Sequence, residues 1–161
     1  MLSKGNKEYV FLHGVPQPEL WDKFKAGKFK ACVIPEGRPD LQSADKNSRA
    51  ILKKKMSPVL IADNMAGFMI SRNMIKEIWL AYQVGDAHGA LCDIGALIYA
   101  ILGKKHGVPV FCYPAAKKRR FIGKPREIFY FCEKRIAPRG IQGYVPLLEW
   151  VPGAYIQRVY E

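Results

Sequence analysis

Residues 81–95 place four side chains that could do chemistry within eight positions. They are Asp86, His88, Cys92 and Asp93, and apolar runs precede and follow them. Carboxylate, imidazole and thiolate groups are common metal ligands, but these four follow no established ligand spacing. The apolar pattern also predicts a helix over 91–107, and Cys92 and Asp93 would then lie in its first turn. We therefore expect no metal site and no cofactor.

Other features of the same stretch favour an anion-binding loop or an ordinary helix start. A carboxylate such as that of Asp93 satisfies free backbone N–H groups at a helix N-terminus and interacts favourably with the helix dipole. Gly85 and Gly89 would let backbone amides approach a bound anion at the same place. Two glycines without a fuller motif do not decide between these interpretations.

The elements that must position these residues alternate along the chain. Apolar runs indicate strands at 9–13, 29–35, 58–63, 77–83 and 109–114. Helical spacing and end signals indicate helices at 17–27, 41–55, 64–73 and 91–107. Five β/α steps in a row predict an α/β fold of three layers, with a mostly parallel sheet covered by helices on both faces. Segment 126–135 and the last 25 residues do not follow this alternation.

Polar side chains follow most of the predicted strands. Ligands of open α/β sheets bind beyond the carboxyl ends of the strands, so these residues are candidates for a shared pocket. Each also has a structural explanation, such as a helix N-cap for Asp63 or Asn64, a buried core histidine for His13, or an Arg38–Glu36 pair. The candidates are His13, Glu36, Arg38, Asp63, Asn64, Tyr82, Gln83, Asp86 and His88.

Length and composition predict one domain over 1–161. The 161 residues are 49% hydrophobic, which suffices for a single core. The first fourteen residues lack an uninterrupted apolar segment and no later run reaches membrane-spanning length, so we expect a cytoplasmic protein without membrane contact. Cys32, Cys92, Cys112 and Cys132 show no CxxC spacing and predict neither a disulfide framework nor a zinc site.

The net charge of +12 favours anionic partners. Much of the excess lies in 53–55 and 117–124. Such runs are usually solvated surface, and only Phe121 supplies an aromatic ring within the second. The charge nevertheless makes RNA or ribosome binding one hypothesis, carried by Lys117, Lys118, Arg119 and Arg120.

Several motifs in order along the chain resemble one family. The stretches "VIPEGRPDLQSA", "PVLIADNMAGFMI", "CDIGALIYAILGKKHGVPVFCYPA" and "EKRIAPRGIQGY" are similar to the C-terminal domain shared by methylthioribose-1-phosphate isomerase, ribose-1,5-bisphosphate isomerase and the alpha, beta and delta subunits of translation initiation factor 2B. The resemblance runs nearly end to end. It implies a Rossmann-like sheet as in sugar-phosphate isomerases, a homodimer, and a chain without the family's N-terminal helical domain.

The chain departs from this family at the catalytic positions. The resemblance places the isomerases' cysteine at Gly14, after His13, and their aspartate at Tyr82, before Gln83. Their substrate-contacting Asn-Lys pair corresponds to Cys92-Asp93, which replaces a cation with an anion. A proton-transfer isomerisation needs a group that takes and returns the proton, so the family mechanism is not expected here.

Three functions follow as hypotheses. The first is a non-catalytic domain that binds a sugar phosphate or nucleotide, or acts in assembly, through Arg38, Asp63, Asn64, Tyr82, Gln83, Gly89 and Asp93. The second is an enzyme with a replaced catalytic set. Its acid/base candidates are His13, Asp86 and His88, with Asp63 as a further one, and Arg38 would bind the anionic group of the substrate. The third is the RNA-associated protein described above.

Two structural expectations accompany these hypotheses. Arg38 and Asp93 should either pair across an unliganded pocket or share a ligand that has an anionic and a hydroxyl end. A homodimer could use the aromatic residues of the C-terminal part as interface anchors. These are Tyr144, Trp150, Tyr155 and Tyr160.

Overall fold

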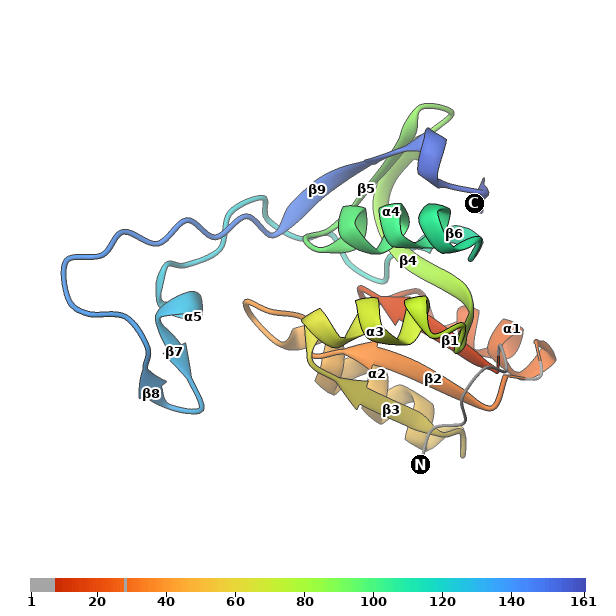
Figure 1. Cartoon of the computed structure of the whole chain (residues 1–161), viewed down its shortest axis with the longest axis horizontal. Helices are drawn as coiled ribbons and strands as arrows, with labels where there is room; N and C mark the ends of the chain where they lie inside the picture. The colour runs from red at the N-terminus through yellow and green to blue at the C-terminus, as the bar shows by residue number, and fades with distance from the viewer. Residues whose placement is uncertain (1–7, 28) are drawn as a thin grey trace.

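Six parallel strands form the centre of the molecule (Figure 1). The structure is a computed structural model that describes residues 8–27 and 29–161. The strands pair in the order β3-β2-β1-β4-β6-β10. The chain therefore builds the sheet outward from β1 in one direction and then from β4 in the other. Their bounds are β1 Tyr9–His13, β2 Ala31–Pro35, β3 Pro58–Ile61, β4 Ile75–Asp86, β6 Val110–Pro114 and β10 Arg158–Val159.

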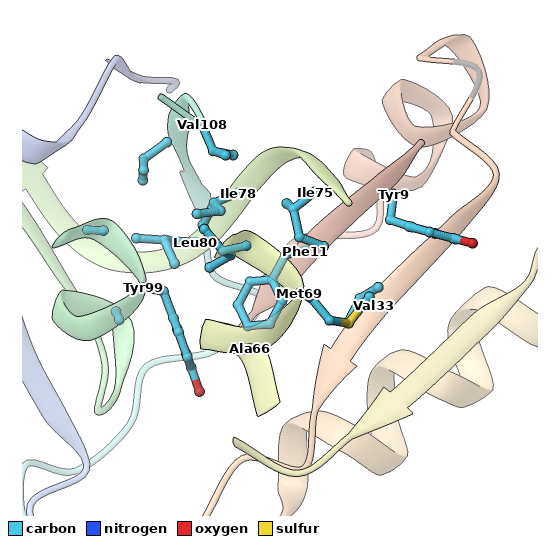
Figure 2. Packing of buried hydrophobic residues seen from close by; sticks show 14 of the residues in the cluster. Tyr9, Phe11, Val33, Ala66, Met69, Ile75, Ile78, Leu80, Tyr99 and Val108 are labelled. Carbon is cyan, nitrogen blue, oxygen red and sulfur yellow. The ribbon is translucent and has the colours of Figure 1, made fainter. Parts of the chain in front are cut away.

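Helices cover both faces of this sheet because alternate strand residues point to opposite sides. On one face, α1 (Leu20–Ala26) and α2 (Gln42–Lys53) pack against Val10 and Leu12. On the other, α3 (Ala66–Ser71) and α4 (Ala96–His106) pack against Tyr9 and Phe11, and Figure 2 shows this second core. The α/β fold with a mostly parallel sheet is confirmed.

The predicted helix start at residue 91 is wrong. Residues Gly89–Asp93 form strand β5, which runs antiparallel to the second half of β4 and to β9 (Leu148–Pro152). Ala90 and Cys92 are fully buried between these neighbours. An apolar run of this length fits a buried strand as well as a helix, and the distant β9 decided between them. Helix α4 begins only after Gly95, where the N–H of Leu97 donates to Glu149 Oε1 at 3.0 Å.

The other predicted elements are confirmed with shorter or longer bounds. The predicted helix at 64–73 is a 3-10 turn, Asp63–Met65, that leads into α3. A second 3-10 turn, Gly153–Tyr155, leads from β9 toward β10. The strand predicted at 77–83 is the middle of the longer β4.

Residues 117–144 leave the body of the molecule, and we call them the arm. They contain α5 (Arg126–Phe129) and a hairpin of two short strands, β7 (Tyr130–Phe131) and β8 (Lys134–Arg135). Figure 1 shows this part extending to one side on two long loops. None of its 28 residues is buried.

Within residues 8–27 and 29–161, no helix has the length and apolar character needed to cross a membrane. Residues 1–7, half of the segment considered above for a leader sequence, lie outside the described residues.

Candidate functional site

A pocket of about 400 Å³ lies past the carboxyl ends of β1 and β6. The strand order reverses between β1 and β4, and the crevice at such a point is where open α/β sheets bind ligands. One part of its wall is apolar: Val15, Pro16, Pro18, Trp21, Ala50, Ala115 and Ala116. The polar part contains Gln42, Lys46, Asn47, Asp93, Lys117, Lys118 and Arg119.

Arg119 joins three distant segments at this pocket. Its guanidinium donates to Asp93 Oδ2 at 2.7 Å and to Asp40 Oδ2, which lies before α2. Its backbone N–H donates to Gln83 Oε1 at 2.7 Å. The side chain is 20% exposed and each carboxylate side chain 9%, so water screens these ion pairs only partly.

The expected Arg38–Asp93 pair is therefore wrong as a description of this state, because Asp93 pairs with Arg119. Asp93 also lies at the end of β5 rather than in a helix turn, so the helix-dipole explanation given above does not apply. The basic run 117–124 predicts a solvated surface position, or an RNA contact, for Arg119. Sequence analysis could not find these ion pairs, because Arg119 is 79 residues from Asp40 and 26 residues from Asp93 along the chain.

His13 and Gly14 at the end of β1 are both buried. The His13 Nε2 atom lies 2.9 Å from the Ile94 carbonyl and 3.3 Å from that of Asp93, and its ring packs edge-on against Tyr99. Because both partners are carbonyl oxygens, Nε2 carries a proton and donates it. This places His13 on the face covered by α4, holding the β5–α4 loop.

Gly14 lies against the neighbouring strand. Its φ is +79°, and a Cβ atom at this position would lie 2.8 Å from the Cβ of Ala81. Its carbonyl accepts a hydrogen bond from Asn47 Nδ2 at 2.8 Å. Asn47 is 1% exposed and lines the pocket, yet sequence analysis missed it, because a polar residue within an amphipathic helix usually faces solvent.

Tyr82 is turned toward the C-terminal end of the chain. Its hydroxyl donates to the Tyr160 carbonyl at 2.7 Å. Burial, followed by the nearby charge of Glu161, raises the pKa of this phenol. The neighbouring Gln83 instead accepts from the backbone of Arg119, so the two residues serve different parts of the molecule.

Arg38, Asp63 and Asn64 lie together at a second pocket, of about 420 Å³, on the side of the sheet covered by α3 and α4. Both Asp63 carboxylate oxygens accept backbone N–H groups, from Gly37 and Arg38 at 2.8 Å each, so Asp63 braces the loop after β2. The Arg38 guanidinium donates to the Tyr130 carbonyl at the root of the hairpin. Ile94, Gly95 and Tyr99 also line this pocket.

Asp86, His88 and Gly89 lie at the turn between β4 and β5. Asp86 Oδ1 accepts the N–H groups of His88 and Gly89, and the side chains of Asp86 and His88 are exposed. The five extended residues Gly89–Asp93 separate the turn from Asp93 by about 13 Å. The structure therefore does not bring Asp86 and His88 to His13, and no three His, Cys, Asp or Glu side chains among the described residues form a metal-binding group.

The C-terminal aromatic residues divide into two pairs. Tyr144 and Trp150 are exposed, at 77% and 41%. Tyr155 packs against the α3–α4 core and Tyr160 stacks on Tyr113 with ring centroids 4.8 Å apart. The first pair is therefore more accessible to a partner than the second, which is partly buried.

Comparison with known proteins gives relatives over most of the chain. No protein-family model matches it. It is 28% identical over 144 residues to methylthioribose-1-phosphate isomerase of Desulforudis audaxviator, and 28% over 145 residues to that of Carboxydothermus hydrogenoformans. These alignments cover 82% and 83% of this chain but 41% and 42% of the relatives, so the chain spans about two fifths of their length.

Solved structures with the same fold come from both branches of the resemblance. The delta subunit of translation initiation factor eIF-2B from A. fulgidus superposes with a TM-score of 0.81 at 16% identity, over 96% of this chain and 52% of that one. The 5-methylthioribose 1-phosphate isomerase of Pyrococcus horikoshii OT3 gives 0.77 at 22% identity, over 99% and 50%. The chain is thus similar over most of its length to methylthioribose-1-phosphate isomerases and shares the fold of an initiation factor 2B subunit, as its motifs predict.

Proposed function

We propose that this chain is a ligand-binding domain without isomerase activity. It would hold a sugar phosphate or nucleotide in the pocket between α1 and α2. The observation that carries the proposal is the pocket itself, whose lining combines apolar residues with three lysines at the switch point of the sheet. An apolar pocket with a few converging polar groups is the usual form of a small-molecule site.

The geometry at residues 14 and 82 supports the absence of isomerase chemistry. A cysteine at position 14 would need a side chain in the left-handed region and would collide with Ala81. Tyr82 is engaged with the Tyr160 carbonyl, and its raised pKa keeps the phenol protonated at neutral pH. Neither position offers a group that could take a proton from a bound sugar.

The charges around the pocket define the ligand class. Arg119 is already engaged by two carboxylates, which leaves Lys46, Lys117 and Lys118 to contact an anionic group. The wall around Trp21 would take the apolar or aromatic part of the same molecule. A plain phosphate ion would gain only the lysine contacts and bind weakly.

Thermal shift measurements test this assignment. A ligand that binds only the folded state raises its melting temperature, so nucleotides, sugar phosphates and plain phosphate can be ranked. We expect Lys46→Ala with Lys117→Ala to reduce the largest shift and Arg38→Ala, at the other pocket, to leave it unchanged. The opposite pattern would place the ligand in the Arg38 pocket, and no shift with any compound would refute ligand binding.

An activity assay tests the second half of the proposal. Purified protein is expected not to isomerise methylthioribose 1-phosphate or ribose 1,5-bisphosphate above the uncatalysed rate. Turnover that is lost in a Lys46→Ala variant would show that a replaced catalytic set exists.

Self-association is proposed as well, with Trp150 as an available anchor. Light scattering at tens of micromolar protein is expected to give the mass of a dimer, and a monomer at that concentration would refute it.

A further inference from the structure

The arm carries most of the excess positive charge of the protein. Its 28 residues contain nine Lys and Arg and two Glu, a net charge of +7 out of +12 for the whole chain. Charge of one sign concentrated on one extended segment attracts polyanions and raises their association rate.

The arm also exposes large apolar side chains without forming a core. None of residues 117–144 is buried, and a hairpin with strands of two residues has little stability alone. Three aromatic rings are open to solvent: Phe121 at 65%, Phe131 at 49% and Tyr144 at 77%. The exposed aliphatic residues of the arm are Ile122, Ile136 and Ile141.

Some arm cations are engaged within the chain and others are available. Arg119 and Arg120 pair with carboxylates, and Arg126 and Arg135 stack on the rings of Tyr130 and Phe129. The other five cations of the arm form no ion pair with any residue that the structure describes, and they are Lys117, Lys118, Lys124, Lys134 and Arg139. The arm thus presents both free cations and exposed aromatic faces.

We infer that the arm binds single-stranded nucleic acid. Free lysines contact the phosphate backbone and release counterions, while unstacked bases lie on the exposed aromatic faces. A duplex keeps its base faces stacked and offers no partner for these rings, which favours a single strand. An acidic polypeptide would satisfy the cations but has no comparable use for aromatic faces.

Fluorescence anisotropy with labelled 20-nucleotide RNA and DNA single strands tests the inference. The affinity should fall steeply as salt rises. Replacing Lys124, Lys134 and Arg139 by Ala, which spares the ligand pocket, should lower the salt-dependence slope by about 2, because each contacted phosphate of a single strand contributes about 0.7. The matched control removes the same charge elsewhere, with Lys25, Lys53 and Lys105 changed to Ala, and should bind as the wild type does.

The aromatic contribution is measured separately. Phe121→Ala with Tyr144→Ala should weaken binding about tenfold at unchanged net charge, whereas Phe68→Ala, an exposed ring on α3, should have no effect. Binding of RNA alone or of DNA alone would identify the natural source, and binding of both would support the shared chemistry.

Three results would overturn the inference. One is the absence of binding to either strand at low salt. Another is an equal loss of affinity in the arm variant and in the lysine control, which would mean that net charge alone attracts the strand. The third is binding of poly-glutamate as tight as that of the 20-mers with no effect of the aromatic substitutions, which would identify an acidic protein as the partner.

Discussion

The sheet core and the arm differ in what holds them in place. Phe11 in β1 is fully buried beneath α3 and α4, with its ring 4.7 Å from that of Tyr99. Phe131 in the arm is half exposed, and its ring contact is with the Arg38 guanidinium. Burial fixes the core, whereas a few polar contacts fix the arm.

Those polar contacts lie where the arm meets the carboxyl edge of the sheet. Arg119 joins the start of the arm to Asp40 and Asp93, and Arg38 joins the body to the carbonyl of Tyr130. Arg119 lines the first pocket and Arg38 lines the second. Substitutions that break these contacts are therefore expected to alter ligand binding more than substitutions elsewhere that lower the free energy of unfolding equally.

The largest effect is expected from paired phenylalanine substitutions. Phe11→Ala should lower the free energy of unfolding by about 3–5 kcal/mol, because a buried ring is lost and a cavity remains. Phe131→Ala should lower it by about 0.5 kcal/mol or less, as for other surface positions. Urea unfolding followed by circular dichroism measures both, and equal losses would mean that the arm is part of the cooperative core.

Removal of Arg119 should have the next largest effect. Arg119→Ala leaves the carboxylates of Asp40 and Asp93 poorly hydrated and without their cation, and should lower the free energy of unfolding by about 2–4 kcal/mol. The same change at Arg120, whose exposed pair with Glu127 is screened by water, should cost about 1 kcal/mol or less.

A combined variant separates charge from packing at this position. Arg119→Leu with Asp40→Asn and Asp93→Asn removes the unpaired charges and should recover much of the stability lost in Arg119→Ala. If the combined variant is as unstable as the single one, the hydrogen-bond geometry of Arg119 matters more than its charge.

A smaller difference in stability is expected between the alanine variants of two glycines with positive φ. Gly14 (φ +79°) lies against Ala81, whereas a Cβ at Gly140 (φ +88°) in the arm would meet no atom within 4 Å. Alanine is strained at both positions, but only at Gly14 does it also collide, so Gly14→Ala should be about 1–3 kcal/mol more destabilising. Ala81→Gly should relieve the collision and narrow the difference in thermal unfolding.

Chemical modification of the cysteines should have the smallest effect on stability. Cys132 in the arm is exposed, whereas Cys32, Cys92 and Cys112 are buried free thiols. Burial raises the pKa of Cys32, and a hydrogen bond with Cys112, then burial, raises that of Cys92, so both stay protonated and unreactive at pH 8.

A thiol reagent should therefore modify one cysteine in the folded protein and all four after unfolding in urea. The melting temperature should not change after the first reaction. Rapid modification of more than one thiol in the folded protein would show that the core opens readily.

Much of the sheet could be predicted from the sequence because its signals are local. The runs at residues 9–13 and 109–114 are apolar and short, and both form strands with nearly those bounds. The predicted helix at 91–107 is wrong at its start, because the same apolar residues suit a helix or a buried strand. Only the approach of β9, from more than 50 residues further along, made residues Gly89–Asp93 a strand.

The candidate site depended far more on tertiary structure. The sequence determined which cations, carboxylates and glycines exist, and that Gly14 and Tyr82 occupy the positions where the resemblance predicts the isomerases' catalytic residues. It did not determine that Arg119, within a basic run, turns inward to Asp40 and Asp93, or that Arg38 lies at a different pocket from Asp93. Hydrophobic periodicity repeats over a few residues and can be read along the chain. Ion pairs depend on which distant segments the fold brings together, and no local pattern records that.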